Sequence, residues 1–170
     1  EFDGVEAEIK LYYKSGDSVR EKLAITISQM VKPLNISIQP IGADWDTISK
    51  NMHSSPVVMG FGSHSASEVN YLYNSEFAGV DFYNSGLYKN TKVDELLQSA
   101  KHAPSWEESL IFWREAQDLA SQDEPWTWLI NIDHLYATDS CLNLGAPITE
   151  PHTHGWSILG NIDEWRWTCQ

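Results

Sequence analysis

The sequence predicts an α/β fold: a strand–helix–strand–helix–strand run builds a mixed sheet flanked by helices, and two more helices and a returning strand follow. Three observations carry this prediction. Segments that alternate apolar and polar residues are separated by segments whose apolar residues recur at helical spacing. This order is typical of a parallel sheet with right-handed crossovers. At 170 residues and 42% hydrophobic content, the chain is long and apolar enough for one domain with a buried core.

The first half of the chain supplies the predicted sheet. Residues 7–14 (AEIKLYYK) alternate and contain aromatic residues, which favours a strand. Ser18 and Glu21 have the spacing of a capping box, so we expect a helix from Ser18 to about residue 34. Residues 36–41 (ISIQPI) read as the second strand.

A short second helix and a third strand complete the predicted sheet. Trp45, Ile48 and Met52 recur at helical spacing, and residues 56–61 (PVVMGF) form an apolar strand. Residues 60–90 are then rich in Gly, Ser, Asn and Tyr, which predicts a long loop of the kind that often serves function.

The second half begins with two predicted helices. The first covers residues 91–102, and Ser105 with Glu108 caps the second. From Pro125 the chain alternates strictly, so we expect a strand whose one face carries these side chains: Trp126, Trp128, Ile130, Ile132, His134 and Tyr136.

Charge and composition narrow the possible functions. The chain has 11 Lys and Arg against 24 Asp and Glu, a net charge of −13, which disfavours binding to nucleic acids and to anionic membranes. No apolar run approaches the 18 residues of a membrane span. The chain opens Glu1-Phe2-Asp3-Gly4 with neither an initiator Met nor a leader, so we expect a piece of a longer protein or a processed product.

Motifs for cofactor binding and catalysis are missing. Gly60-Phe61-Gly62 begins like a dinucleotide fingerprint, but position 65 is Ser, and no phosphate-binding loop occurs. Ser63 adjoins His64 in the chain, yet no Gly-x-Ser-x-Gly nucleophile motif is present. We therefore predict neither a cofactor nor an enzyme.

A metal site is the strongest rival among the polar motifs. His152 and His154 have the i, i+2 spacing that turns two imidazoles to one side of an extended strand, and His64, His134 or a carboxylate could supply a third ligand. An ordered turn between Pro151 and Gly155 is the simpler interpretation. His134 reads as a core histidine, and His53 and His102 as helix-end residues favoured by the dipole. Cys141 and Cys169 either form one disulfide or remain two thiols.

The geometry of the fold points to residues 61–65. Ligands of open α/β sheets bind beyond the carboxyl ends of the parallel strands, and the aromatic, Gly- and Ser-rich loop follows the third strand. We expect residues 61–65 to form part of a binding wall. The alternative is a flexible connection with buried tyrosines.

The order of these segments resembles one family. Residues 11–61 contain the "SGDSVR" helix start, the "KPLNISIQ" turn and "DW" at the next helix. "GFGSH" then spans residues 60–64, and "LYKNTKVDELLQSAK" and "WREAQDLASQDEPWTWLIN" follow. Together they resemble the C-terminal lobe of family 5 extracellular solute-binding proteins, the oligopeptide, dipeptide and nickel receptors of ABC importers. The likeness covers roughly residues 5–140.

The resemblance implies a two-lobed, periplasmic-binding-protein-like receptor without catalysis, which closes over a small solute and delivers it to a membrane permease. It would lie in the periplasm or be lipid-anchored on the extracellular face of the membrane. Residues 1–144 would be one lobe, and residues 145–170 a tail that crosses to the other lobe, leaving Trp156, Trp165 and Trp167 short of native neighbours. Export fits a Cys141–Cys169 disulfide, and one lobe alone would bind solute weakly.

The resemblance also implies a ligand site at Phe61, Gly62, Ser63 and His64. Phe61 matches the ligand-facing aromatic of the family, and His64 stands where peptide receptors carry an acid for the peptide amino terminus. A neutral His cannot make that charge-assisted bond, so a modified peptide or a metal chelate gains ground over free peptides. The alternative is a nickel or metal-chelate receptor that uses His64, His152 or His154.

Overall fold

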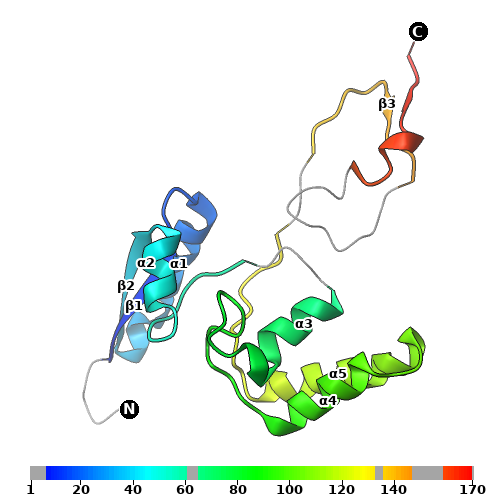
Figure 1. Cartoon of the computed structure of the whole chain (residues 1–170). Helices are drawn as coiled ribbons and strands as arrows, with labels where there is room; N and C mark the ends of the chain where they lie inside the picture. The colour runs from blue at the N-terminus through cyan, green and yellow to red at the C-terminus, as the bar shows by residue number, and fades with distance from the viewer. Residues whose placement is uncertain (1–6, 61–64, 133–135, 147–158, 170) are drawn as a thin grey trace.

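The computed structural model describes residues 7–60, 65–132, 136–146 and 159–169. Figure 1 shows the first strands and helices gathered in one unit, three later helices in a second unit, and the C-terminal segments in a separate hairpin. The mixed α/β architecture predicted from the sequence is confirmed.

The sheet unit is built on two parallel strands. β1 (Ala7–Lys14) pairs with β2 (Ile36–Ala43) along its whole length. A third parallel segment lies on the other side of β1, where the amide of Tyr12 donates to Pro56 O at 2.9 Å and the amide of Val58 donates to Tyr12 O at 2.8 Å. The predicted strand at residues 56–61 is thus a bridge in the part that the structure describes.

The crossover from β1 to β2 is α1 (Ser18–Val31) followed by the short helix η1 (Lys32–Leu34). The predicted Ser18 cap is wrong by one residue, because the Asp17 carboxylate caps the helix and Ser18 is its first residue. The regular helix ends before Pro33, which has no amide hydrogen to donate. α2 (Trp45–Asn51) follows β2 and confirms the short second helix.

The predicted loop at residues 60–90 contains a helix that sequence reasoning missed. α3 (Ala66–Tyr73) begins at Ser65, whose hydroxyl accepts the amide of Glu68, and η2 (Ser75–Phe77) follows. The remainder, residues 78–90, forms turns without regular structure.

The second unit is a packed set of helices. α4 (Thr91–Lys101) and α5 (Trp106–Gln122) confirm both predicted helices. Ser105 is confirmed as the cap of α5, because its hydroxyl accepts the Glu108 amide at 3.2 Å. The same hydroxyl donates to the Glu108 carboxylate at 3.1 Å.

The returning strand is not formed in the described residues. Residues 125–132 and 136 belong to no strand, and Trp128, Ile130 and Ile132 are more than half exposed. Further on, β3 (Leu142–Asn143) pairs antiparallel with β4 (Arg166–Trp167), next to the turn of η4 (Ile162–Glu164). A disulfide between Cys141 and Cys169 closes this hairpin, which settles the two alternatives for the cysteines.

The two units have separate hydrophobic cores. Leu11, Ala24 and Val58 form the core of the sheet unit. The helical unit buries a larger cluster from α3, α4 and α5, in which Val93, Leu97 and several small residues are fully enclosed. None of the described helices has the length and apolar character needed to cross a membrane.

Candidate functional site: the carboxyl edge of the parallel sheet

β1 and β2 end side by side, with Lys14 opposite Ala43 in the register. The chain leaves this edge to begin α1 at Asp17 and α2 at Asp44, while the third parallel segment reaches Gly60. In open α/β sheets this edge is where ligands bind. The side chains that follow the strand ends are therefore the candidate site residues.

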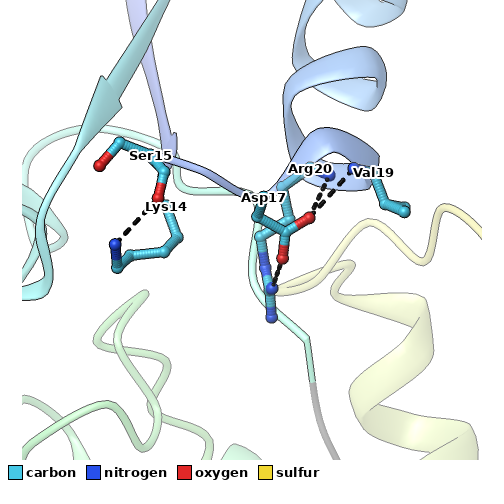
Figure 2. Close-up of polar contacts among 5 residues, drawn as sticks. All are labelled: Lys14, Ser15, Asp17, Val19 and Arg20. Carbon is cyan, nitrogen blue, oxygen red and sulfur yellow. Dashed lines mark hydrogen bonds and ion pairs between the residues drawn. The ribbon is translucent and has the colours of Figure 1, made fainter.

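Asp17 has two roles at the start of α1 (Figure 2). Its Oδ1 accepts the amides of Val19 at 3.1 Å and Arg20 at 2.9 Å, and its Oδ2 accepts a hydrogen bond from Nη1 of Arg20. The hydrogen bond from the Arg20 amide holds the pKa of Asp17 below its usual range. Partial desolvation raises this pKa, and the Arg20 guanidinium lowers it further. The carboxylate is therefore an anion at neutral pH and fixes the Arg20 side chain.

Arg20 is a cation at this edge, as is Lys14, whose Nζ donates to Ser15 O at 2.9 Å. Only part of the Arg20 guanidinium is engaged. Nη1 is paired with Asp17, whereas Nε is enclosed and has no hydrogen-bond partner among the described residues. A β-carbon on Gly60 would lie 2.6 Å from Nη2, so the missing side chain of Gly60 makes room for the guanidinium. An arginine with an unused, desolvated donor is suited to receive an oxygen of a bound anion.

Trp45 supplies an aromatic surface next to Arg20. The centre of the guanidinium lies 5.9 Å from the centroid of the indole, within reach of a cation–π interaction. Asp44 fixes the start of α2, because its Oδ1 accepts the Thr47 amide at 2.7 Å, and this hydrogen bond lowers the pKa of Asp44. Trp45 is still 38% exposed, so a ligand can contact it.

The four ligand-binding residues predicted from the sequence, Phe61, Gly62, Ser63 and His64, lie outside the described residues. Their site stays a prediction. The residue directly before them, Gly60, lies beside Arg20 at the carboxyl edge.

The metal ligands predicted from the sequence, His64, His134, His152 and His154, lie outside the described residues, and their site stays a prediction. His53 and His102 follow α2 and α4, where Nδ1 of His53 lies 2.9 Å from Ser85 O, and Nδ1 of His102 lies 2.8 Å from Gln98 O. The described part of the chain contains no group of three or more His, Cys, Asp or Glu placed to hold a metal ion.

Sequence reasoning missed Asp17, Arg20 and Trp45 as site residues, because it placed the cap at Ser18 and used Trp45 only to mark the short second helix. A signal was present. An Asp-x-x-Arg spacing directly after a strand puts an acid at the helix cap and a cation one turn later, at the edge where ligands bind.

Two known proteins are similar to this chain in sequence. No family model matches it. Protein XP55 of Streptomyces lividans is 33% identical over 136 residues, covering 79% of this chain and 25% of that protein. The oligopeptide-binding protein AppA of Bacillus subtilis is 22% identical over 170 residues, covering 96% of this chain and 30% of AppA.

Solved structures agree with these sequence matches. The structure of AppA from Bacillus subtilis with a nonapeptide has a TM-score of 0.68 and 21% identity, and covers 99% of this chain and 33% of that one. NikZ from Campylobacter jejuni with Ni(L-His) has a TM-score of 0.70 and 18% identity, covering 96% and 34%.

The chain spans about a quarter to a third of the length of the relatives it matches. Sheet, crossovers and helices correspond in order to the segments on which the sequence resemblance rested, and that resemblance is confirmed. The chain has the fold of the family 5 extracellular solute-binding proteins, the peptide and nickel receptors.

Proposed function

We propose that this chain is a lobe of an exported solute receptor, and that the solute binds at the carboxyl edge of β1 and β2 with Arg20 as an anion contact. The observation that carries this proposal is the Arg20 guanidinium, which keeps an enclosed Nε without a partner beside the aromatic ring of Trp45. The predicted wall at residues 61–65 would continue the site from Gly60.

The solute we favour carries a carboxylate and an apolar part. A guanidinium pairs well with a carboxylate, and an indole covers apolar or planar groups. A peptide has both features, and AppA, which has the same fold, is described in complex with a nonapeptide. Binding would be completed when a second lobe closes over the solute, after which the receptor delivers it to an ABC permease.

A metal chelate is the second candidate. NikZ, at a TM-score of 0.70, is described in complex with Ni(L-His), and histidine also carries a carboxylate. In this version Arg20 would hold the carboxylate of the chelate, and His64, His152 or His154 would be the metal ligand.

Export is supported by the disulfide. A Cys141–Cys169 bond persists in an oxidising compartment and is rare in the cytosol. We propose that the receptor lies in the periplasm or, lipid-anchored, on the outer face of the membrane.

The first experiment uses the complete protein that carries these 170 residues, because burial from both lobes would contribute to affinity. Native mass spectrometry, followed by acid release, identifies any solute that is purified with it. Binding of alanine peptides of two to nine residues, and of Ni²⁺ with excess L-histidine, is then measured by calorimetry. Peptide binding supports the first candidate and Ni–histidine binding the second.

Arg20→Ala should weaken binding of the active probe by about tenfold to hundredfold, because a hydrogen bond to a charged group is lost. Arg114→Ala is the control, since Arg114 lies on the exposed face of α5. Equal affinity in the two variants would contradict the role of Arg20. Failure of both probes to bind would contradict both candidates.

A further inference from the structure

We infer that Phe82, which lies outside the carboxyl edge of the sheet, is a positioning residue that holds Arg20 in place through Trp45. The inference rests on the proposed function, since the side chain it positions is the proposed anion contact. It assigns a role to the turns of residues 78–87, the positioning loop, which belong to the helical unit.

The positioning loop belongs to the helical unit and contacts the sheet unit, which has a separate core. It follows α3 and lies on the side of the helical unit that faces β1, β2 and α2 (Figure 1). Its contacts with the sheet unit involve α2 and its end. Phe82 meets Trp45 edge to face, with ring centroids 5.3 Å apart and planes at 75°. Nδ1 of His53, just past the end of α2, lies 2.9 Å from Ser85 O.

The loop is held firmly enough to act as a support. Asn84 is 1% exposed; its amide nitrogen donates to Asn74 O and Tyr88 O, and its side-chain oxygen accepts the Tyr88 amide at 2.8 Å. Asp81 and Leu87 have φ angles of 47° and 58°. Such left-handed conformations are costly for residues with side chains and persist only where the surroundings fix them.

The ring of Phe82 therefore projects from an anchored loop and contacts the partly exposed side chain of Trp45. Trp45 is 38% exposed, and one of its ring contacts comes from Phe82 and another from Arg20. Edge-to-face contact restricts the rotation of the indole. The orientation of the indole in turn decides whether its face is presented to the guanidinium. Removing the ring of Phe82 should let Trp45 rotate and so weaken its contact with the Arg20 guanidinium, which Asp17 still holds through Nη1.

The test follows the Arg20 Nε–H group by nitrogen-15 NMR in the 170-residue chain. The chain has only three arginines, Arg20, Arg114 and Arg166, so the Arg20 signal can be assigned from its loss in Arg20→Lys. Phe82→Leu keeps most of the apolar volume and removes the aromatic edge. We expect its Arg20 signal to shift and its hydrogen exchange to quicken several-fold, with Phe82→Tyr restoring the original signal.

Phe77→Leu is the matched control, because Phe77 packs against Tyr71 and Tyr83 instead, at centroid distances of 4.9 and 5.9 Å. An unchanged Arg20 signal in Phe82→Leu, or an equal change in Phe77→Leu, overturns the inference. Circular dichroism of each variant verifies that the helices remain folded.

In the complete protein, Phe82→Leu should weaken binding of the active probe by about two- to fivefold, the size of a lost cation–π contact. If the unaltered protein binds neither probe, the proposed function is rejected. A changed Arg20 signal in Phe82→Leu would then still support the positioning of Arg20 by Phe82. The opposite pattern, tight probe binding that does not change in Phe82→Leu, would reject the positioning role alone.

Discussion

Asp17 joins the local structure of α1 to the chemistry of the sheet edge. One of its oxygens satisfies two amides at the helix start, and the other engages the Arg20 guanidinium. Most N-cap residues serve only the helix. Because this one also neutralises the nearest cation, a bound anion would compete with Asp17 for Arg20, and the pair sets how strongly the edge attracts negative charge.

Asp17→Asn should reveal this coupling through pH. Asparagine keeps the cap but lacks the charge. The folded pKa of Asp17 lies below its unfolded value, so the charge adds stability above pH about 4, the unfolded pKa. That stability is lost as pH falls through the folded pKa. We expect the unaltered chain to be more stable than Asp17→Asn at pH 6, and the difference to shrink below pH about 4.

Urea unfolding at several pH values measures this difference. Asp118→Asn, on the exposed face of α5, controls for the general effect of removing one acid from a chain of net charge −13. A stability difference for Asp17→Asn that is the same at pH 6 and pH 3 would contradict the assigned role of the carboxylate.

Helix boundaries could be predicted where a cap and a periodic apolar stripe coincide. Ser105 begins α5 as expected, and Thr91–Lys101 forms α4. α3 was missed, although Ser65 and Glu68 stand at capping distance, because the surrounding Ser, Asn and Gly residues favour a loop in composition. Local composition and a helix start signal disagreed there, and packing of Leu72 and Tyr73 into the helical core decided the outcome.

The segment from Pro125 shows the opposite limit. Its alternation predicts a strand, but a strand needs a neighbour to receive its backbone hydrogen bonds, and alternation does not identify that neighbour. In the described residues Ile130 and Ile132 remain 54% and 61% exposed. For the candidate site, fold geometry pointed to residues that directly follow Gly60 and lie outside the described residues, so that prediction stays untested. The engagement of Arg20 became visible only through its contacts.

The packing of α4 against α5 gives a direct test of the helical core. Leu97 is fully buried, so Leu97→Ala should reduce the free energy of unfolding by about 2–5 kcal/mol through lost contacts and a cavity. Ile111→Ala is the control, because Ile111 on α5 is 57% exposed and its truncation should cost under about 1 kcal/mol. Thermal or urea unfolding compares the two, and equal losses would contradict the described packing.

The C-terminal hairpin depends on a covalent link across 28 residues of sequence. Among the described residues, strand pairing and hydrogen bonds also hold it. Asn161 donates to Leu144 O and Ala146 O, and the Thr168 amide donates to Cys141 O at 2.8 Å. Closing a loop of this length is worth about 3–4 kcal/mol on a chain-entropy estimate, which is large for so small a hairpin.

Reduction of the disulfide should therefore loosen the hairpin and leave the helical unit intact. We expect hydrogen–deuterium exchange with mass spectrometry to show lost protection in residues 141–146 and 159–169 after reduction, and unchanged protection in α4 and α5. Cys141→Ser with Cys169→Ser should reproduce the effect without a reductant. Loss of protection in α5 as well would contradict the independence of the hairpin.

The two separate cores have a consequence for how this protein melts. The sheet unit rests on a small core around Leu11, Ala24 and Val58, whereas the helical unit encloses a larger one. We expect heating to produce two transitions rather than one, with the sheet unit giving way first. A solute held at the Arg20 edge stabilises mainly the folded sheet unit, so it should raise the lower transition toward the upper one. At saturating solute the two thermal transitions would merge into one, so the number of transitions would indicate whether the site is occupied.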